Sequence, residues 1–325
     1  MKKLIVILIG LVVGLEATAQ SYPNVTQKYR YLAYFSPAMA GMNDNLDINA
    51  GFNFQPSGLD NTLNTNFFSG YYSTGVSQGS RNAIRGTQSV DDYYGRRQRA
   101  ELKMGFGTAI MSEDVGEITS TYNSNAFAVH VPIADHTYLS MGVAVGFNFR
   151  TVNGDRFTAR DGGDEVIIEV GQDKNNSSLH IDAGLGVTSD EFYLAVGLNN
   201  LTNVYMSGNE ILTEKIFISN FMGGYRLYHS NDLEAIVMAM VNVQENFDPA
   251  WNVGVRGRYR QILMAGFNYT GDGSFITQLG LQMNDYLNVG YSFAYKGSST
   301  AVVNSIHELG IGLRLMNHNK YVPIW

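Results

Sequence analysis

The chain has 325 residues, of which 45% are hydrophobic and only 16% are charged, with 20 Tyr, 17 Phe, 35 Gly and no Cys. The missing cysteines exclude a disulfide scaffold and thiolate metal or redox chemistry, and the many aromatics with few charges exclude a disordered chain. The formal net charge of −7 argues against nucleic acid as a partner.

The first residues predict export. Lys2 and Lys3 precede an apolar run at residues 4–13, and a small-x-small site follows at residues 17–19. A charged start, an apolar stretch too short to span a bilayer comfortably and such a site are typical of a secretory signal peptide. We therefore expect residues 1–19 to be a cleaved signal peptide, with an uncleaved anchor as the alternative.

Beyond this segment, apolar side chains alternate with polar or small ones. Successive side chains of a strand point to opposite faces, so each alternating strand separates an apolar environment from a polar one. Most of these segments have the length that a tilted strand needs to cross the hydrocarbon layer. The pattern predicts fourteen strands, at residues 46–55, 63–74, 101–112, 120–132, 137–151, 178–189, 191–200, 216–228, 232–242, 251–259, 262–269, 274–283, 287–295 and 305–316.

The connections between these segments also alternate in length. Short turns on one rim and long loops on the other are typical of outer-membrane barrels. Two connections depart from the pattern, because a tight turn at 271–273 falls on the loop rim and a long connection at 75–100 falls on the turn rim. The tight connections are at 134–136, 189–190, 229–231, 260–261 and 284–286, and the longer ones are at 152–177, 201–215, 243–250 and 296–304.

A soluble β-sandwich is the alternative fold, but its outward face would carry charges, whereas the polar positions here hold mainly Gly, Asn, Ser, Ala and Gln. Lipid offers no partners for backbone groups, so a sheet in a membrane must close on itself. We therefore predict an all-β transmembrane antiparallel barrel of about 14 strands at 46–316 in the cell outer membrane. Residues 20–45 are expected to be an N-terminal periplasmic segment and residues 317–325 a C-terminal tail.

Three motifs follow one another along the chain. The first is Ser36-Pro37-Ala38-Met39-Ala40-Gly41, the second begins His180-Ile181-Asp182-Ala183-Gly184 and runs on to Leu201, and the third is Ser305-Ile306-His307-Glu308-Leu309. In this order they resemble the PorP/SprF family, outer-membrane proteins of the Bacteroidota type IX secretion system and gliding machinery. The resemblance covers almost the whole chain after the signal segment.

This resemblance implies a role in protein secretion or surface anchoring. The resemblance implies that the protein binds a secreted adhesin, the cargo, and holds it at the outer membrane by the C-terminal domain of that cargo. The resemblance also implies contact with the periplasmic ring of the translocon and with associated lipoproteins. The alternative function is a passive outer-membrane channel or a hydrophobic-solute transporter.

Charged side chains at lumen-facing positions are candidates for partner binding. Buried charges need partners, so one interpretation is internal ion pairing that makes the barrel rigid. The other is an electrostatic lining that receives a cargo tail or filters solutes. The candidates are Arg150, His180, Asp182, Arg256, Arg258, Arg260, Glu308 and Arg314.

A second basic group lies in the long connection at 75–100. If this connection faces the periplasm, its arginines are candidates for docking acidic surfaces of ring components, and a solvated connection is the alternative. The candidates are Arg81, Arg85, Arg96, Arg97 and Arg99.

We expect neither catalysis nor a bound cofactor. The chain has six His, and no nucleophile, base and orienting group can be placed together around any of them. His180 and Asp182 supply only two ligands at strand spacing, which do not make a metal site. A lipid hydrolase is a third interpretation of the function.

Overall fold

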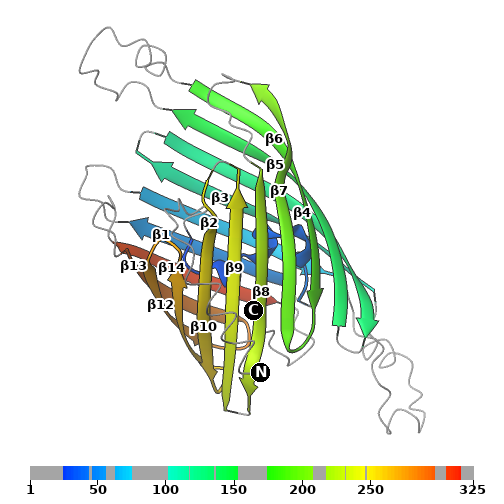
Figure 1. Cartoon of the computed structure of the whole chain (residues 1–325), viewed down its shortest axis with the longest axis vertical. Helices are drawn as coiled ribbons and strands as arrows, with labels where there is room; N and C mark the ends of the chain where they lie inside the picture. Colours follow the sequence, from blue (N-terminus) through cyan, green and yellow to red (C-terminus); the bar gives the residue numbers. More distant parts are fainter. Residues whose placement is uncertain are drawn as a thin grey trace.

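The computed structural model describes residues 25–43, 46–55, 63–74, 102–116, 118–134, 137–152, 174–207, 217–230, 232–245, 247–296 and 305–315. These residues form a closed antiparallel barrel in which each strand pairs with its neighbours in sequence (Figure 1). The strands are β1 (Leu46–Gln55), β2 (Leu63–Ser73), β3 (Lys103–Val115), β4 (Ile118–Ala134), β5 (Thr137–Val152), β6 (Lys174–Thr188), β7 (Phe192–Ser207), β8 (Ile218–His229), β9 (Leu233–Gln244), β10 (Ala250–Tyr259), β11 (Leu263–Thr270), β12 (Ser274–Gln282), β13 (Leu287–Lys296) and β14 (Ser305–Leu315).

The first strand closes the barrel against the last. β1 and β14 are antiparallel neighbours, with Leu46 opposite Leu315 and Phe54 opposite His307. This pairing leaves no strand edge open to lipid, where unpaired backbone groups would be costly. The predicted barrel of 14 strands is confirmed.

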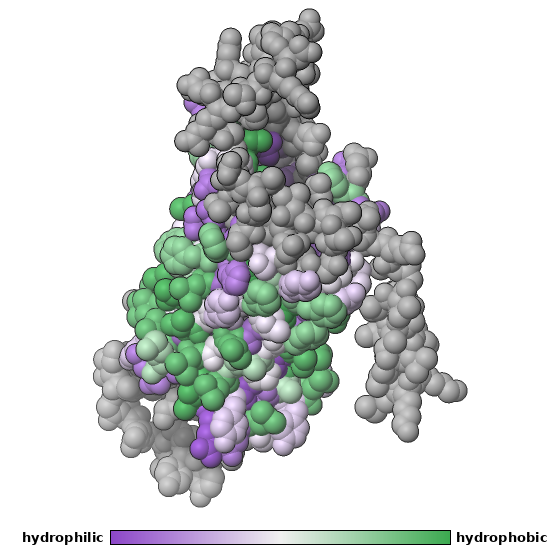
Figure 2. Space-filling view, turned by 90° about the vertical axis from the view of Figure 1, so that its left-hand side faces the viewer, coloured by the Kyte–Doolittle hydropathy of each residue, from purple (hydrophilic) through white to green (hydrophobic). Residues whose placement is uncertain are grey.

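The alternation along each strand sorts side chains between lipid and lumen. On β1, Phe52 and Phe54 are 52% and 51% exposed, whereas Asn53 and Gln55 are 3% and 1% exposed. Hydrophobic side chains accordingly cover much of the outer wall in the space-filling view (Figure 2). The outer surface is therefore apolar where a soluble protein would be polar, as a wall facing lipid requires.

β7 extends furthest beyond the range that the alternation predicts. β7 continues past residue 200 to Ser207, and Asn200 has a positive φ of 59°. The pairing with β6 shifts register between Ile181 and Ala183, and the backbone N–H of Asn200 donates to Oδ1 of Asp182 at 2.8 Å. Such an irregularity interrupts the alternation without ending the strand, which explains the early end of the predicted strand.

The two rims of the barrel differ in their connections. We call the rim that carries the connections 135–136, 189–191, 230–232, 260–262 and 283–286 the turn rim, and the opposite rim the loop rim. The turn rim also holds the long connection 74–102, as predicted, while the loop rim has tight turns at both 116–117 and 271–273. In outer-membrane barrels, short turns generally face the periplasm.

The segment before β1 lies inside the barrel. It forms η1 (Lys28–Arg30), α2 (Leu32–Phe35) and η2 (Pro37–Met39), which appear in blue among the strands in Figure 1. We call residues 25–42 the plug; all but three of them are buried. The prediction of a periplasmic segment at 20–45 is therefore wrong for the described residues 25–42, since their aromatic and small apolar side chains are buried in the lumen. No helix among the described residues is long and apolar enough to span a membrane.

Candidate functional site

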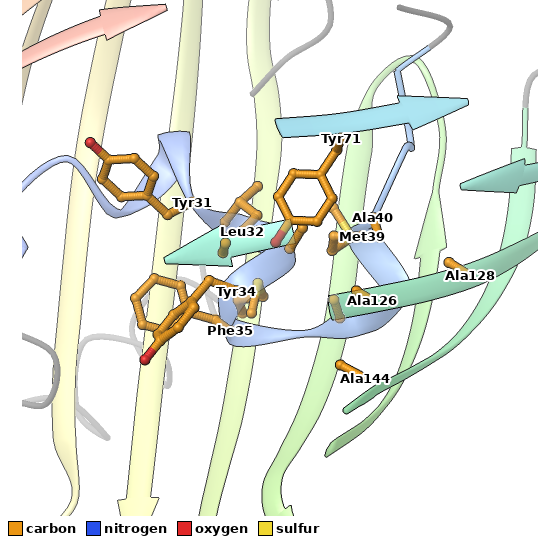
Figure 3. Close-up of a cluster of buried hydrophobic side chains, with 14 of the residues drawn as sticks. Tyr31, Leu32, Tyr34, Phe35, Met39, Ala40, Tyr71, Ala126, Ala128 and Ala144 are labelled. Carbon is orange, nitrogen blue, oxygen red and sulfur yellow. The ribbon is translucent and has the colours of Figure 1, made fainter. Parts of the chain in front are cut away.

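The centre of the lumen is an aromatic core shared by the plug and the wall. Tyr31 and Tyr34 of the plug pack against Phe67 of β2, with ring centroids 3.9 Å and 5.4 Å apart. Tyr34 also meets Phe35 edge-on at 5.6 Å, and Tyr71 of β2 closes the cluster (Figure 3). Aromatic pairs of this kind contribute about 0.5–1.5 kcal/mol beyond the area that they bury, so the plug is held by its own hydrophobic core.

Glycines of the wall let the plug backbone come close. A Cβ on Gly184 would lie 2.6 Å from Oγ of Ser36 and 2.8 Å from the backbone N of Ala38, closer than side chains tolerate. Gly105 of β3 is in similarly close contact with the carbonyl of Ala40. Further wall glycines that approach the plug are Gly142, Gly197, Gly290 and Gly310.

Glu308 anchors the start of the plug. Its Oε2 accepts hydrogen bonds from the backbone N–H of Thr26 at 2.6 Å, from Oγ1 of Thr26 at 2.7 Å and from the backbone N–H of Gln27 at 3.3 Å. Nε2 of Gln278 donates to the carbonyl of Thr26 at 2.9 Å. This predicted lumen candidate therefore binds a segment of its own chain.

Buried polar side chains hold the carbonyls of the rest of the plug. Nε2 of His130 lies 2.9 Å from the carbonyl of Ala40, while its Nδ1 lies 2.8 Å from Oγ of Ser140. Nδ2 of Asn220 donates to the carbonyl of Phe35 at 3.1 Å. His130 and Asn220 were not among the predicted site residues, although both occupy lumen positions of alternating strands.

The three sequence motifs meet at the plug. The first motif is part of it, the second supplies Gly184 and Gly197 on β6 and β7, and the third supplies Glu308 on β14. Residues more than 250 positions apart, such as Thr26 and Glu308, thereby come into contact. The motifs that carry the family resemblance build the filled lumen.

The plug separates two cavities. The one on the loop-rim side has about 350 Å³ of empty space, including space open to solvent, and its polar lining residues include His180, Asp182 and Asn220. Nε2 of His180 lies 3.5 Å from Oδ2 of Asp182, whose other oxygen holds the β7 irregularity. Arg150, near the same rim, donates to Oγ of Ser120 at 3.4 Å. These three predicted lumen candidates thus face the loop-rim side and are engaged with the wall.

The cavity on the other side, which we call the turn-rim vestibule, is larger and cationic. It has about 1150 Å³ of empty space, including space open to solvent, and its charged lining residues are Arg30, Asp47, Arg256, Arg258 and Arg314. Its mouth reaches the β10–β11 turn and the ends of β12 and β14 at the turn rim. Arg256, Arg258 and Arg314, all predicted to face the lumen, are brought together here.

The vestibule arginines are held in place by neighbours. Arg258 forms an ion pair with Glu234, and Nε of Arg314 lies 3.0 Å from Oδ1 of Asp47. Arg256 stacks on the ring of Tyr29 of the plug, with its guanidinium carbon 4.3 Å from the ring centroid. These contacts fix the guanidinium groups around the cavity.

Two arginines depart from the prediction. Arg260 lies outside the vestibule on the exposed rim, where it pairs with Asp232 at 3.1 Å. Arg226 of β8, whose Nε lies 2.7 Å from Oε1 of Glu234, was not among the predicted candidates. Arg226 lies four residues after Met222, so the alternation places both side chains on the lumen face of β8 and could have identified Arg226.

The remaining predicted residues lie outside the described part of the chain. They are Arg81, Arg85, Arg96, Arg97 and Arg99, together with the signal peptide at 1–19 and the tail at 317–325. Within the described ranges, no three His, Asp or Glu side chains gather as a metal site would require.

Comparisons with known proteins identify the chain's relatives. A family model described as type IX secretion system membrane protein PorP/SprF matches residues 17–313. A search of curated proteins finds no match. Among solved structures, the chain is similar to the CymD monoaromatic hydrocarbon channel, with a TM-score of 0.52, 11% identity and coverage of 92% of this chain and 94% of that one.

Two further solved barrels are similar at lower scores. The toluene transporter TbuX of Ralstonia pickettii has a TM-score of 0.48 and 10% identity, covering 86% of this chain and 92% of its own. The outer membrane protein Omp33 of Acinetobacter baumannii has a TM-score of 0.45 and 11% identity, covering 85% and 100%. At such identities the likeness to solved structures shows a fold and no shared activity.

Proposed function

The chain belongs to the PorP/SprF family of type IX secretion system membrane proteins, and from this premise we propose that it is a docking barrel of the outer membrane. In this proposal it holds a secreted adhesin-type cargo by the C-terminal domain of that cargo and couples it to the translocon. In this role the barrel binds its partners and catalyses no reaction.

The observation that carries this proposal is the filled lumen. The plug is anchored by Glu308 at its start, by His130 near its end and by the aromatic core around Phe67 between them. A barrel that encloses its own chain offers a rigid frame with two rims, and rigid frames hold binding loops well.

The two rims suit different partners. The loop rim faces outward and carries the connections 153–173, 208–217 and 297–304, which we propose as the surface for the cargo domain. The turn rim faces the periplasm, where translocon ring components and lipoproteins lie within reach. A cargo held on one rim is thereby linked to machinery on the other.

The filled lumen weighs against the passive channel. A conducting barrel needs a continuous aqueous path, and here the buried side chains of Tyr31, Phe35 and Met39 lie between the two cavities. Solute passage would require the plug to leave the lumen. The passive channel is the alternative function, and conductance of the purified barrel would distinguish it from docking.

An affinity-tagged copy in its own host tests the proposal. After mild detergent extraction, the tagged barrel should co-purify with a cargo C-terminal domain and with translocon subunits. Replacing residues 297–304 by a short Gly-Ser linker should abolish cargo recovery and spare the translocon subunits. Equal cargo recovery after replacement of each outward loop, or ion conductance of the purified barrel in liposomes, would contradict the proposal.

A further inference from the structure

The smaller cavity, on the loop-rim side of the plug, is lined by one carboxylate and by no fixed cation. We call it the loop-rim cavity; its empty space is about 350 Å³, including space open to solvent. Asp182 is the only acid in its described lining, which contains neither Lys nor Arg. Apart from His180, the other lining residues are uncharged, namely five Asn, two Tyr and one Phe.

The carboxylate of Asp182 is buried without an opposite permanent charge. Asp182 is 2% exposed, and its Oδ1 accepts the backbone N–H of Asn200 at 2.8 Å. The side chain of Asn199 is a further hydrogen-bond partner and is also neutral. In the described part of the chain, Asp182 has an ion-pair distance only to His180. Burial of a carboxylate without a cation is costly, so a cation that enters the cavity is favoured.

His180 leaves a hydrogen-bond acceptor open. Its Nε2 lies 3.5 Å from Oδ2 of Asp182, which is longer than the roughly 2.7–3.2 Å of an N–H···O hydrogen bond. We assign the ring proton to Nε2, because this atom faces the carboxylate, and Nδ1 is then the acceptor of the neutral ring. Nδ1 is buried and has no hydrogen-bond partner among the described residues, and the whole side chain is 6% exposed.

A second open acceptor lies diagonally across the wall. Oδ1 of Asn148, on β5, is buried without a hydrogen-bond partner in the described ranges, and Asn148 lines the same cavity. Asn148 pairs with Ser178, two residues before His180 on β6, so both side chains share the lumen face. Diagonal neighbours on a sheet are about 7–8 Å apart, so one small group can lie between their side chains.

These groups together define the chemistry of a ligand. The carboxylate favours positive charge, and the two open atoms accept hydrogen bonds, so the ligand must be a cation that donates them. A primary ammonium supplies three N–H donors and one charge. A hydroxyl would supply a donor without the charge. A guanidinium binds best to both oxygens of one carboxylate, and Oδ1 of Asp182 is already engaged by Asn200.

The rest of the lining suits a slender chain behind this ammonium. Tyr34 and Phe35 of the plug (Figure 3) and Tyr122 of β4 add aromatic residues to the cavity. Aromatic residues offer apolar surface to methylene groups and attract a nearby cation. The plug lies between this cavity and the turn rim, so a ligand enters from the loop rim.

We propose that the loop-rim cavity binds a primary ammonium group on an unbranched alkyl chain, with Asp182, His180 and Asn148 as its ligands. A lysine side chain of another protein and a free alkyl amine both carry this group. A lysine of the cargo would deepen the proposed function, and only that source rests on it. The site is tested with a synthetic probe, so its failure would leave the co-purification of cargo untouched.

The test uses the purified full-length barrel in detergent. The probe is dansylcadaverine, whose primary amine stands on a five-carbon chain, and the control is the same molecule with its amine acetylated. We expect the amine to bind about five-fold or more tightly than the acetylated control, as measured by dansyl anisotropy against empty micelles. This comparison needs no variant protein.

Variants then locate the binding site. Asp182→Asn removes the charge at constant shape, and His180→Phe removes the ring acceptor. Each should weaken binding of the amine by about five-fold or more and leave the acetylated probe unchanged. Matched controls are Glu245→Gln, an exposed acid on the loop rim, and Asp232→Asn on the exposed turn rim, which should change affinity less than about two-fold. A β-sheet circular dichroism spectrum equal to that of the parent shows that each variant is folded.

Competition distinguishes the two sources of the amine. Displacement of the probe by a blocked Gly-Lys-Gly peptide, but not by its acetyl-lysine form, would assign the site to a lysine side chain. Displacement by free cadaverine without displacement by the peptide would assign it to small amines. Either result supports an ammonium site.

Four outcomes would overturn the proposal. Equal binding of the amine and the acetylated probe would show that the charge is not recognised. Equal losses in the control variants would place the probe elsewhere. Equal binding of a trimethylammonium analogue, which has no N–H donor, would show that the open acceptors do not hold the ligand. Complete displacement by millimolar Ca²⁺ would mark a metal site instead.

Discussion

Glu308→Ala should release the start of the plug while leaving the barrel closed. The substitution removes the acceptor of the Thr26 N–H at 2.6 Å, of the Thr26 hydroxyl at 2.7 Å and of the Gln27 N–H at 3.3 Å. The hydroxyl keeps a contact with Ser292, so two buried N–H groups lose their acceptor, each at a cost of about 1–3 kcal/mol. Together with the weaker hydrogen bonding of the Thr26 hydroxyl, this should make the free energy of plug docking less favourable by about 3–6 kcal/mol.

The missing cysteines provide a clean assay. Ser36→Cys places a thiol in the plug at a position that is fully buried when the plug is docked. If labelling by a water-soluble maleimide follows the population of the undocked plug, a loss of 3–6 kcal/mol should raise the labelling rate by about 10²- to 10⁴-fold. Gln261→Cys on the exposed β10–β11 turn serves as the fully accessible reference.

Two controls make this prediction decisive. Glu308→Gln keeps one neutral acceptor and should give an intermediate labelling rate. The wall should be unaffected, because the β1–β14 pairing is made by backbone groups, so the variant and the parent barrel should give the same β-sheet circular dichroism spectrum. If Glu308→Ala labels no faster than the parent barrel, the carboxylate does not hold the plug and the reasoning fails.

Three further perturbations follow from the same contacts. Gly184→Val should displace the plug through a clash with its backbone, so the labelling rate at Ser36→Cys should approach the reference while the barrel still forms. Burial lowers the pKa of Lys28 from 10.5 to about 8, so the docked plug disfavours the charged lysine. Docking should therefore become more favourable as the pH rises from 8 to 10.5, and the labelling rate at Ser36→Cys, normalised to the reference, should fall. Lys28→Met should remove this pH dependence. Arg260→Gln, on an exposed rim, should change the free energy of unfolding in urea by about 0–1 kcal/mol.

The wall could be predicted from the sequence because each of its residues experiences one of two environments. Phe52 meets lipid and Asn53 meets the lumen, so hydrophobicity alternates along the strand and the period is visible without any partner. The largest departure is on β7, where a local hydrogen bond interrupts the alternation. Asp182 holds the irregular backbone of Asn200, and the strand that continues to Ser207 was for that reason predicted to end early.

The plug could not be predicted in this way, because its signal is complementarity between distant segments. The alternation of β3 and β6 places Gly105 and Gly184 on the lumen side, but nothing in their own strands indicates that Ala40 and Ala38 lie against them. The role of Glu308 likewise depends on Thr26, at the other end of the chain. The plug consists of three short helical segments, so its apolar residues follow neither a strand period nor a long-helix period. From the sequence alone it therefore resembles a linker.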